Sequence, residues 1–231
     1  MFQTQRYAHS RVSDSEMAAH LRQVFSYMTG GVALSGIVAY LTLNSPALLS
    51  MATSGGTAIL FFVIWFAFAF LMHKILFNVQ PAVALGIFAA FSAFTGFALT
   101  PIVLVYTQAS IVSAFAVASL MFAGTSLYGY ATDKNLSGWG TFISMGAWGI
   151  LGLIAVYLIG SLLGFQLEGM SLMISILVVP LIAAATAFEV NMLKENYAQY
   201  AGNEMMKSRM EIYGAASLYM NFVVLFIHLL N

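Results

Sequence analysis

Seven long apolar stretches constrain this chain more than any other feature of its sequence. Each is close to the roughly 20 residues that an α-helix needs to cross the hydrocarbon core of a bilayer. Only 7% of the residues are charged, whereas a globular domain usually has about 25%. The sequence therefore predicts an all-α integral membrane protein, a bundle of seven transmembrane helices. The predicted spans are residues 24–43, 56–72, 81–99, 110–130, 139–163, 171–193 and 210–230.

The basic residues predict how the seven helices are oriented. All 8 lysines and arginines lie before the first stretch or in the connections after the second, fourth and sixth. Seven spans put these segments on one side of the membrane, and an excess of basic residues marks the cytoplasmic side. We therefore predict that the N-terminus is cytoplasmic, that residues 1–23 form a hydrophilic tail, and that residues 24–231 form the seven-helix domain.

Composition and motifs argue against several other functions. The net charge is zero, so nucleic acid is not an expected partner. The chain contains no cysteine, which excludes disulfides and thiolate metal sites. His73 and His228 have no His, Asp or Glu at the helical spacing of metal ligands, and no nucleophile and base form a catalytic set. We therefore expect no metal site, no cofactor and no enzymatic activity.

The sixth apolar stretch contains the first group of candidate functional residues. Glu189 is the one acid that lies inside an apolar stretch rather than in a tail, loop or helix end. Ser175, Thr186 and Glu189 fall within about 60° of arc on a helix. An acid within a membrane is by default a functional candidate. The alternative is structural, with Glu189 reaching the nearby cytoplasmic surface or pairing with Lys194 or Lys74.

The seventh stretch has a polar stripe of its own. Gly214, Ser217, Asn221 and His228 fall within about 60° of arc among Leu, Val, Phe and Ile. Asn221 lies near mid-membrane, where it could line an ion path or simply form a hydrogen bond between helices. Glu189, Asn221, Ser217 and Thr186 are the predicted ion path or pH sensor.

Tyrosines near the predicted cytoplasmic ends suggest a simpler role. Tyr197, Tyr200 and Tyr213 surround the connection between the sixth and seventh spans. Because tyrosine is favoured at the headgroup level, we expect these three side chains to act as membrane-interface anchors.

Several segments together resemble the Bax inhibitor family, also called the transmembrane Bax inhibitor motif family. The similarity covers nearly the whole chain from about residue 20, in the same order. The segments are Leu-Arg-Gln-Val-Phe at 21–25 with Gly-Gly at 30–31, Phe-Thr-Gly-Phe-Ala-Leu-Thr-Pro at 94–101, Ser-Leu-Tyr-Gly-Tyr at 126–130, Asn-Leu-Ser-Gly-Trp-Gly at 135–140, Leu-Lys-Glu-Asn-Tyr at 193–197 and Ser-Leu-Tyr-Met-Asn-Phe at 217–222.

The resemblance implies a fold and two kinds of function. It implies a seven-helix bundle with the last helix at its centre, in a bacterial inner membrane. It implies a pH-sensitive Ca²⁺ leak, as in characterised prokaryotic members. The alternative that it implies is a non-channel regulator of a membrane-anchored AAA protease or another membrane complex. For that alternative, the N-terminal tail and the basic connection between the last two spans are the expected contact surfaces.

One position departs from the family pattern. The family site is a pair of Asp residues on the sixth and seventh helices, which match Glu189 and Asn221 of this chain. Two close carboxylates cannot both remain charged, so such a pair senses pH. A Glu–Asn pair lacks this repulsion, although the amide oxygen can still bind a cation. The departure therefore predicts, for a cation path, weak Ca²⁺ binding and a less steep response to pH, and the missing second acid somewhat favours the non-channel regulator.

Overall fold

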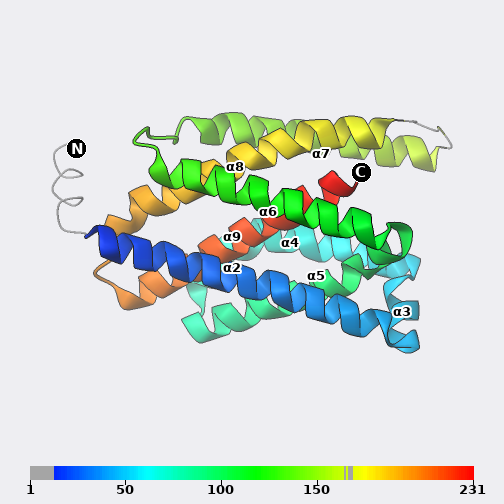
Figure 1. The fold of residues 1–231 in the computed structure, drawn as a ribbon, viewed down its shortest axis with the longest axis horizontal. Coiled ribbons are helices and arrows are strands. Elements are labelled where there is room, and N and C mark those ends of the chain that lie inside the picture. The colour runs from blue at the N-terminus through cyan, green and yellow to red at the C-terminus, as the bar shows by residue number, and fades with distance from the viewer. Residues whose placement is uncertain (1–12, 164, 166–168) are drawn as a thin grey trace. The chain divides into compact units, whose positions relative to one another are not determined.

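A computed structural model describes residues 13–163, 165 and 169–231. In the described residues, all regular secondary structure is helical (Figure 1). The helices are α2 (Asp14–Leu43), α3 (Pro46–Ala52), α4 (Gly55–Asn78), α5 (Pro81–Val105), α6 (Gln108–Ala131), α7 (Trp139–Leu162), α8 (Met170–Tyr200) and α9 (Glu204–Leu230).

Seven of these helices are long and apolar enough to cross a membrane. This confirms the predicted all-α class and the predicted number of spans, while the cytoplasmic N-terminus stays a prediction. Helix α3 is not among the predicted spans. It is a seven-residue helix in the connection after the first span. The Ser45 hydroxyl accepts the Leu48 N–H at its start and Pro46 occupies its first turn, where the missing N–H of proline is harmless.

Several spanning helices are longer than their apolar stretches. Helix α2 begins at Asp14 rather than near residue 24, α8 continues to Tyr200, and α9 begins at Glu204. A capping box fixes the start of α2, because Ser13 and Glu16 each accept the other's backbone N–H. Residues 14–23 of the predicted tail are thus helical, and residues 1–12 lie outside the described residues. A helix of 31 residues is about 46 Å long, longer than the roughly 30 Å hydrocarbon core.

Helix α5 runs through a proline at which the sequence predicts an end. Its predicted span stops at residue 99, but the helix continues past Pro101 to Val105. Proline lacks the N–H that would bond four residues back. The Thr100 hydroxyl donates to the Gly96 carbonyl at 3.0 Å, and hydroxyl side chains of this kind help membrane helices tolerate proline.

The chain divides into two compact units. The first contains residues 1–108 and 196–219, of which 13–108 and 196–219 are described. Here α2 packs along α5 (Figure 1). At Gly96 the two backbones approach so closely that an added methyl carbon would lie 2.7 Å from the Ser35 Cα. Small residues allow this contact, which is how helices gain dispersion energy in lipid.

Tyr219 of α9 joins the helices of the first unit. It is fully buried, and its hydroxyl lies 2.6 Å from the Ser35 hydroxyl. The tyrosine ring meets Phe88 and Phe91 of α5 edge to face, with ring centroids 5.5 and 6.1 Å apart. Phe91 also stacks on Phe68 of α4 at 3.9 Å. Thus α9 contacts α2 and α5 directly, and α4 completes the aromatic cluster.

The second unit contains residues 109–195 and 220–231, described except for the gaps at 164 and 166–168. Gly129 of α6 and Gly146 of α7 lie against α8, at Ala187 and Leu181 respectively. The C-terminal part of α9 contacts α6 through Phe222, whose ring meets Phe115 and Phe122 edge to face. Of the seven candidate spans, α9 has the largest buried share.

Candidate functional site

Glu189 and Asn221 form a direct contact in the second unit. The Asn221 Nδ2 donates to the Glu189 Oε2 at 2.9 Å. Both side chains are half-buried, and they come from α8 and α9. A carboxylate that accepts an amide N–H keeps part of the solvation it loses on leaving water. The half-buried acid is therefore stabilised by a polar group on the neighbouring helix.

The other two predicted site residues lie one helical turn away from this pair. Thr186 is buried, and its hydroxyl donates to the Ile182 carbonyl at 2.9 Å within α8. Ser217 is half-buried on α9, one turn before Asn221, and belongs to the first unit. The structure thus brings Glu189 and Asn221 together, whereas the Thr186 hydroxyl bonds to its own helix. The roles of all four residues stay predictions.

A second polar contact joins α8 and α9 farther along the same two helices. The His228 Nδ1 lies 2.9 Å from the hydroxyl of Ser175, which is buried. The Asn231 Nδ2 donates to the same hydroxyl at 3.2 Å. Ser175 and His228 each belong to the polar stripe predicted for their helix. The facing parts of α8 and α9 therefore contact through polar groups at two levels.

The opposite face of α8 holds the connection between α6 and α7. Ala187, Asn191 and Lys194 are spaced by four and three residues, so they share one face, roughly opposite Glu189. Asn191 is fully buried. Its Oδ1 accepts the Leu136 N–H at 3.1 Å, and its Nδ2 donates to the carbonyls of Gly129 and Lys134 at 3.3 and 3.4 Å.

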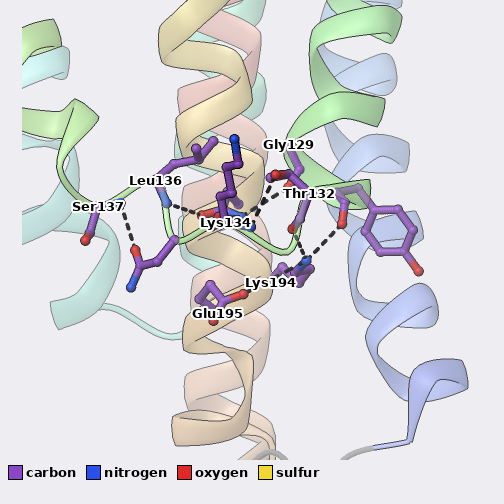
Figure 2. Close-up of polar contacts among 10 residues, drawn as sticks. Gly129, Thr132, Lys134, Leu136, Ser137, Lys194 and Glu195 are labelled. Atoms are coloured by element: carbon purple, nitrogen blue, oxygen red, sulfur yellow. Dashed lines mark hydrogen bonds and ion pairs between the residues drawn. The ribbon is translucent and has the colours of Figure 1, made fainter.

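Lys194 strengthens this attachment by capping the end of α6. Its Nζ donates to the carbonyls of Tyr130 and Thr132 at 3.0 and 2.8 Å, as Figure 2 shows. It also lies 4.0 Å from the Glu195 carboxylate. Cations favour the C-terminal end of a helix because the last carbonyls have no partner within it. The Lys194 ammonium therefore holds the end of α6 against α8, and its proposed pairing with Glu189 stays a prediction.

Sequence reasoning missed a buried polar cluster in the first unit. It treated Tyr197 and Tyr200 as membrane-interface anchors, but their exposed fractions are only 2% and 6%. That expectation is wrong for these two residues, because both pack around His20 near the start of α2. Glu211 of α9 completes this cluster. The hint in the sequence is that His20 lies just before the first apolar stretch and Glu211 at the start of the last one.

These observations define the class of protein. Seven apolar helices and a carboxylate that contacts an amide on the facing helix describe a multi-pass α-helical membrane protein. A family model described as "Inhibitor of apoptosis-promoting Bax1" matches residues 17–231. The chain therefore belongs to the Bax inhibitor family, as its motifs indicate.

Bacterial relatives resemble the chain over almost its full length. The inner membrane protein YbhL of Escherichia coli K12 is 31% identical over 219 residues, which cover 93% of this chain and 91% of that protein. An uncharacterised protein of Caulobacter vibrioides is 32% identical over 234 residues, covering 95% and 91%. An uncharacterised protein of Borreliella burgdorferi is 30% identical over 214 residues, which cover 91% of this chain and 89% of that protein. These similarities agree with the predicted bacterial inner-membrane location.

Proposed function

We propose that this protein is a cation leak channel in which the contact between Glu189 and Asn221 acts as a titratable gate. The observation that supports this proposal most is the 2.9 Å hydrogen bond between the two side chains. It joins an acid of α8 to an amide of α9, each within the apolar stretch of its helix. Ionisable groups in such positions are typical of ion paths.

The protonation of Glu189 sets the state of the gate. When the carboxyl is neutral, it attracts no cation, and the amide holds the two helices together. When it is charged, it attracts cations and its charge requires compensation, which loosens the contact between the helices. An amide can donate to a carboxylate or accept from a carboxyl. A hydrogen bond between the two side chains can therefore form in both protonation states, so the contact loosens only partly when Glu189 is charged, and the response to pH is gradual.

The chemistry of the pair also limits which ions it favours. Ca²⁺ sites usually contain six to eight oxygen ligands, among them several carboxylates. Glu189 supplies one carboxylate and Asn221 one amide oxygen. We therefore expect the pair to bind Ca²⁺ weakly and to discriminate only modestly between different cations.

Glu189→Gln is expected to lower cation flux and to remove its dependence on pH. The substituted glutamine side chain can still form a hydrogen bond with Asn221, but it carries no charge at any pH. The flux should fall by at least about fivefold, because a single charge at contact distance attracts a cation by about 1 kcal/mol or more. The measurement is flux into proteoliposomes that contain a Ca²⁺ dye, with a parallel K⁺ assay. Unchanged flux and pH dependence would exclude this gate.

Asn221→Asp is expected to make the flux depend more steeply on pH. Two facing carboxylates repel each other once both are ionised, so the contact opens over a narrow pH range. The same assay measures the slope of flux against pH. Asn78→Asp is the control, because Asn78 is exposed at the end of α4. An Asn221→Asp slope no greater than that of the control would show that residues 189 and 221 do not act together.

The second candidate function is regulation of a membrane-anchored AAA protease or another membrane complex. It is favoured by the extension of α2 beyond its apolar stretch, where Asp14, Glu16 and Arg22 are exposed. Such a charged surface suits contact with a partner protein. If proteoliposomes show no flux at any pH, this second function becomes the better proposal.

A further inference from the structure

His20 of α2 lies in a buried polar cluster that the gate does not use. Its exposed fraction is 1%, and those of Glu211 and Tyr200 are 7% and 6%. The His20 Nδ1 lies 3.1 Å from the Glu211 Oε1, and its Nε2 lies 3.2 Å from the Tyr200 hydroxyl. The imidazole also stacks on Tyr197, with ring centroids 4.6 Å apart. One imidazole thus joins α2 to the end of α8 and the start of α9.

This geometry accommodates histidine in both protonation states. In the neutral ring, Nδ1–H donates to the Glu211 carboxylate while Nε2 accepts the Tyr200 O–H. In the imidazolium, both ring nitrogens donate, and the Tyr200 oxygen accepts instead. A proton therefore enters without the loss of either hydrogen bond. It converts the bond to Glu211 into an ion pair, and hydrogen bonds between charged groups are stronger than those with one neutral partner.

Among the described residues, Glu211 is the charged group in contact with this buried imidazole. Glu16 of α2, together with Glu204 and Lys207 of α9, acts on Tyr197 through its electric field. Glu16 and Glu204 are exposed to solvent, and Lys207 lies 3.8 Å from Glu204. The charge that faces His20 directly is that of Glu211, while α8 contributes the neutral side chains of Tyr197 and Tyr200. Protonation of His20 therefore decides whether the buried Glu211 charge is balanced.

We propose that His20, Glu211 and Tyr200 form a proton-controlled latch that fastens the start of α2 to α8 and α9. The latch is tightest when His20 is protonated and Glu211 is charged, because the imidazolium and the carboxylate then form an ion pair. It weakens when His20 is neutral, because the buried Glu211 charge is then left unbalanced. It also weakens when Glu211 itself is protonated, because the imidazolium is then buried without a counter-charge. His20 and Tyr200 lie beyond the apolar stretches and Glu211 lies at the start of the last one, so the latch is near the aqueous phase that supplies the proton.

Met17 provides a direct measurement of the latch. It is 8% exposed and packs against Tyr197 and Tyr200. Since the chain has no cysteine, Met17→Cys introduces a single thiol at a position that packs against Tyr197 and Tyr200. Ala19→Cys places a thiol on the exposed side of the same helix and corrects for the intrinsic pH dependence of thiol labelling. The measured quantity is the rate at which a membrane-impermeant maleimide labels the Met17→Cys variant, divided by its rate for the Ala19→Cys variant.

The expected ratio is about fivefold lower at pH 5.5 than at pH 8, since an ion-paired hydrogen bond opens less often. His20→Gln retains hydrogen-bonding groups but cannot titrate, so its ratio should not change with pH. Glu211→Gln leaves the imidazolium without a counter-charge, so its ratio should rise at low pH instead. This reversal would not arise from a purely structural contact. Identical pH dependence in the unsubstituted background and in His20→Gln would overturn the proposal.

A second measurement avoids the substitution at Met17. Hydrogen exchange of the backbone amides near residue 20 reports the same opening in chains without cysteine. After correction for intrinsic exchange rates, protection should be greater at pH 5.5 than at pH 8 in the unsubstituted protein. His20→Gln should abolish this difference, and Glu211→Gln should invert it. A difference of the same sign in Glu211→Gln would overturn the latch even if Met17→Cys fails to fold.

Discussion

Gly96→Ala is expected to lower the midpoint of thermal unfolding by about 6–12 °C or to prevent folding altogether. The added methyl carbon overlaps the Ser35 carbonyl oxygen and lies 2.7 Å from the Ser35 Cα. Both are backbone atoms, so no side-chain rotation relieves the overlap, and α2 and α5 must separate. Overpacking of this kind costs about 3 kcal/mol, and each kcal/mol shifts the midpoint by about 2–4 °C in a chain of this size.

Gly86→Ala is the matched control on the same helix. A methyl carbon at Gly86 meets no atom within 4 Å, and alanine favours a helix over glycine by about 1 kcal/mol. Its midpoint should therefore stay the same or rise slightly. The measurement is the fraction of monodisperse protein in detergent after heating to a series of temperatures. Equal midpoints for the two variants would show that α2 and α5 do not approach closely at Gly96.

The sequence allows the number of spans to be predicted but not their ends. Hydropathy is a local property, so each apolar stretch indicates its own helix. Where a helix continues beyond such a stretch depends on caps, side-chain hydrogen bonds and packing contacts, which hydropathy does not report. Helix α2 extends to Asp14 because Ser13 caps it and because Met17 and His20 are buried. Helix α5 continues through Pro101 with the Thr100 hydroxyl bonded to Gly96.

The candidate site could be anticipated only in part, for a similar reason. Helical periodicity places Glu189 and Asn221 each on a polar stripe, and the structure brings these two side chains into contact. Helical periodicity does not indicate that Lys194 caps α6. Nor does it reveal the contact of His20 with Glu211, which are 191 residues apart in the sequence. Polar residues just outside apolar stretches resemble interface residues until their tertiary partners are known.

Asn191→Leu is expected to destabilise the protein by about 3–5 kcal/mol, since unpaired buried groups cost about 1–3 kcal/mol each. The substitution leaves the Leu136 N–H and the carbonyls of Gly129 and Lys134 without the partner that Asn191 provides. The connection between α6 and α7 should then detach from α8. Thermal unfolding in detergent measures the loss, expected as a decrease of about 10 °C in the midpoint.

Two comparison variants separate the contributions of Asn191. Asn191→Asp keeps the oxygen that accepts the Leu136 N–H but turns an acceptor toward the two carbonyls, so it should be at least as unstable as Asn191→Leu. Asn135→Ala removes an exposed Asn that accepts the Ser137 N–H at 2.8 Å within the same connection. Because that N–H can bond to water instead, the loss should be below about 1 kcal/mol. Equal losses for Asn135→Ala and Asn191→Leu would show that Asn191 does not hold the connection, since burial is what distinguishes the two residues.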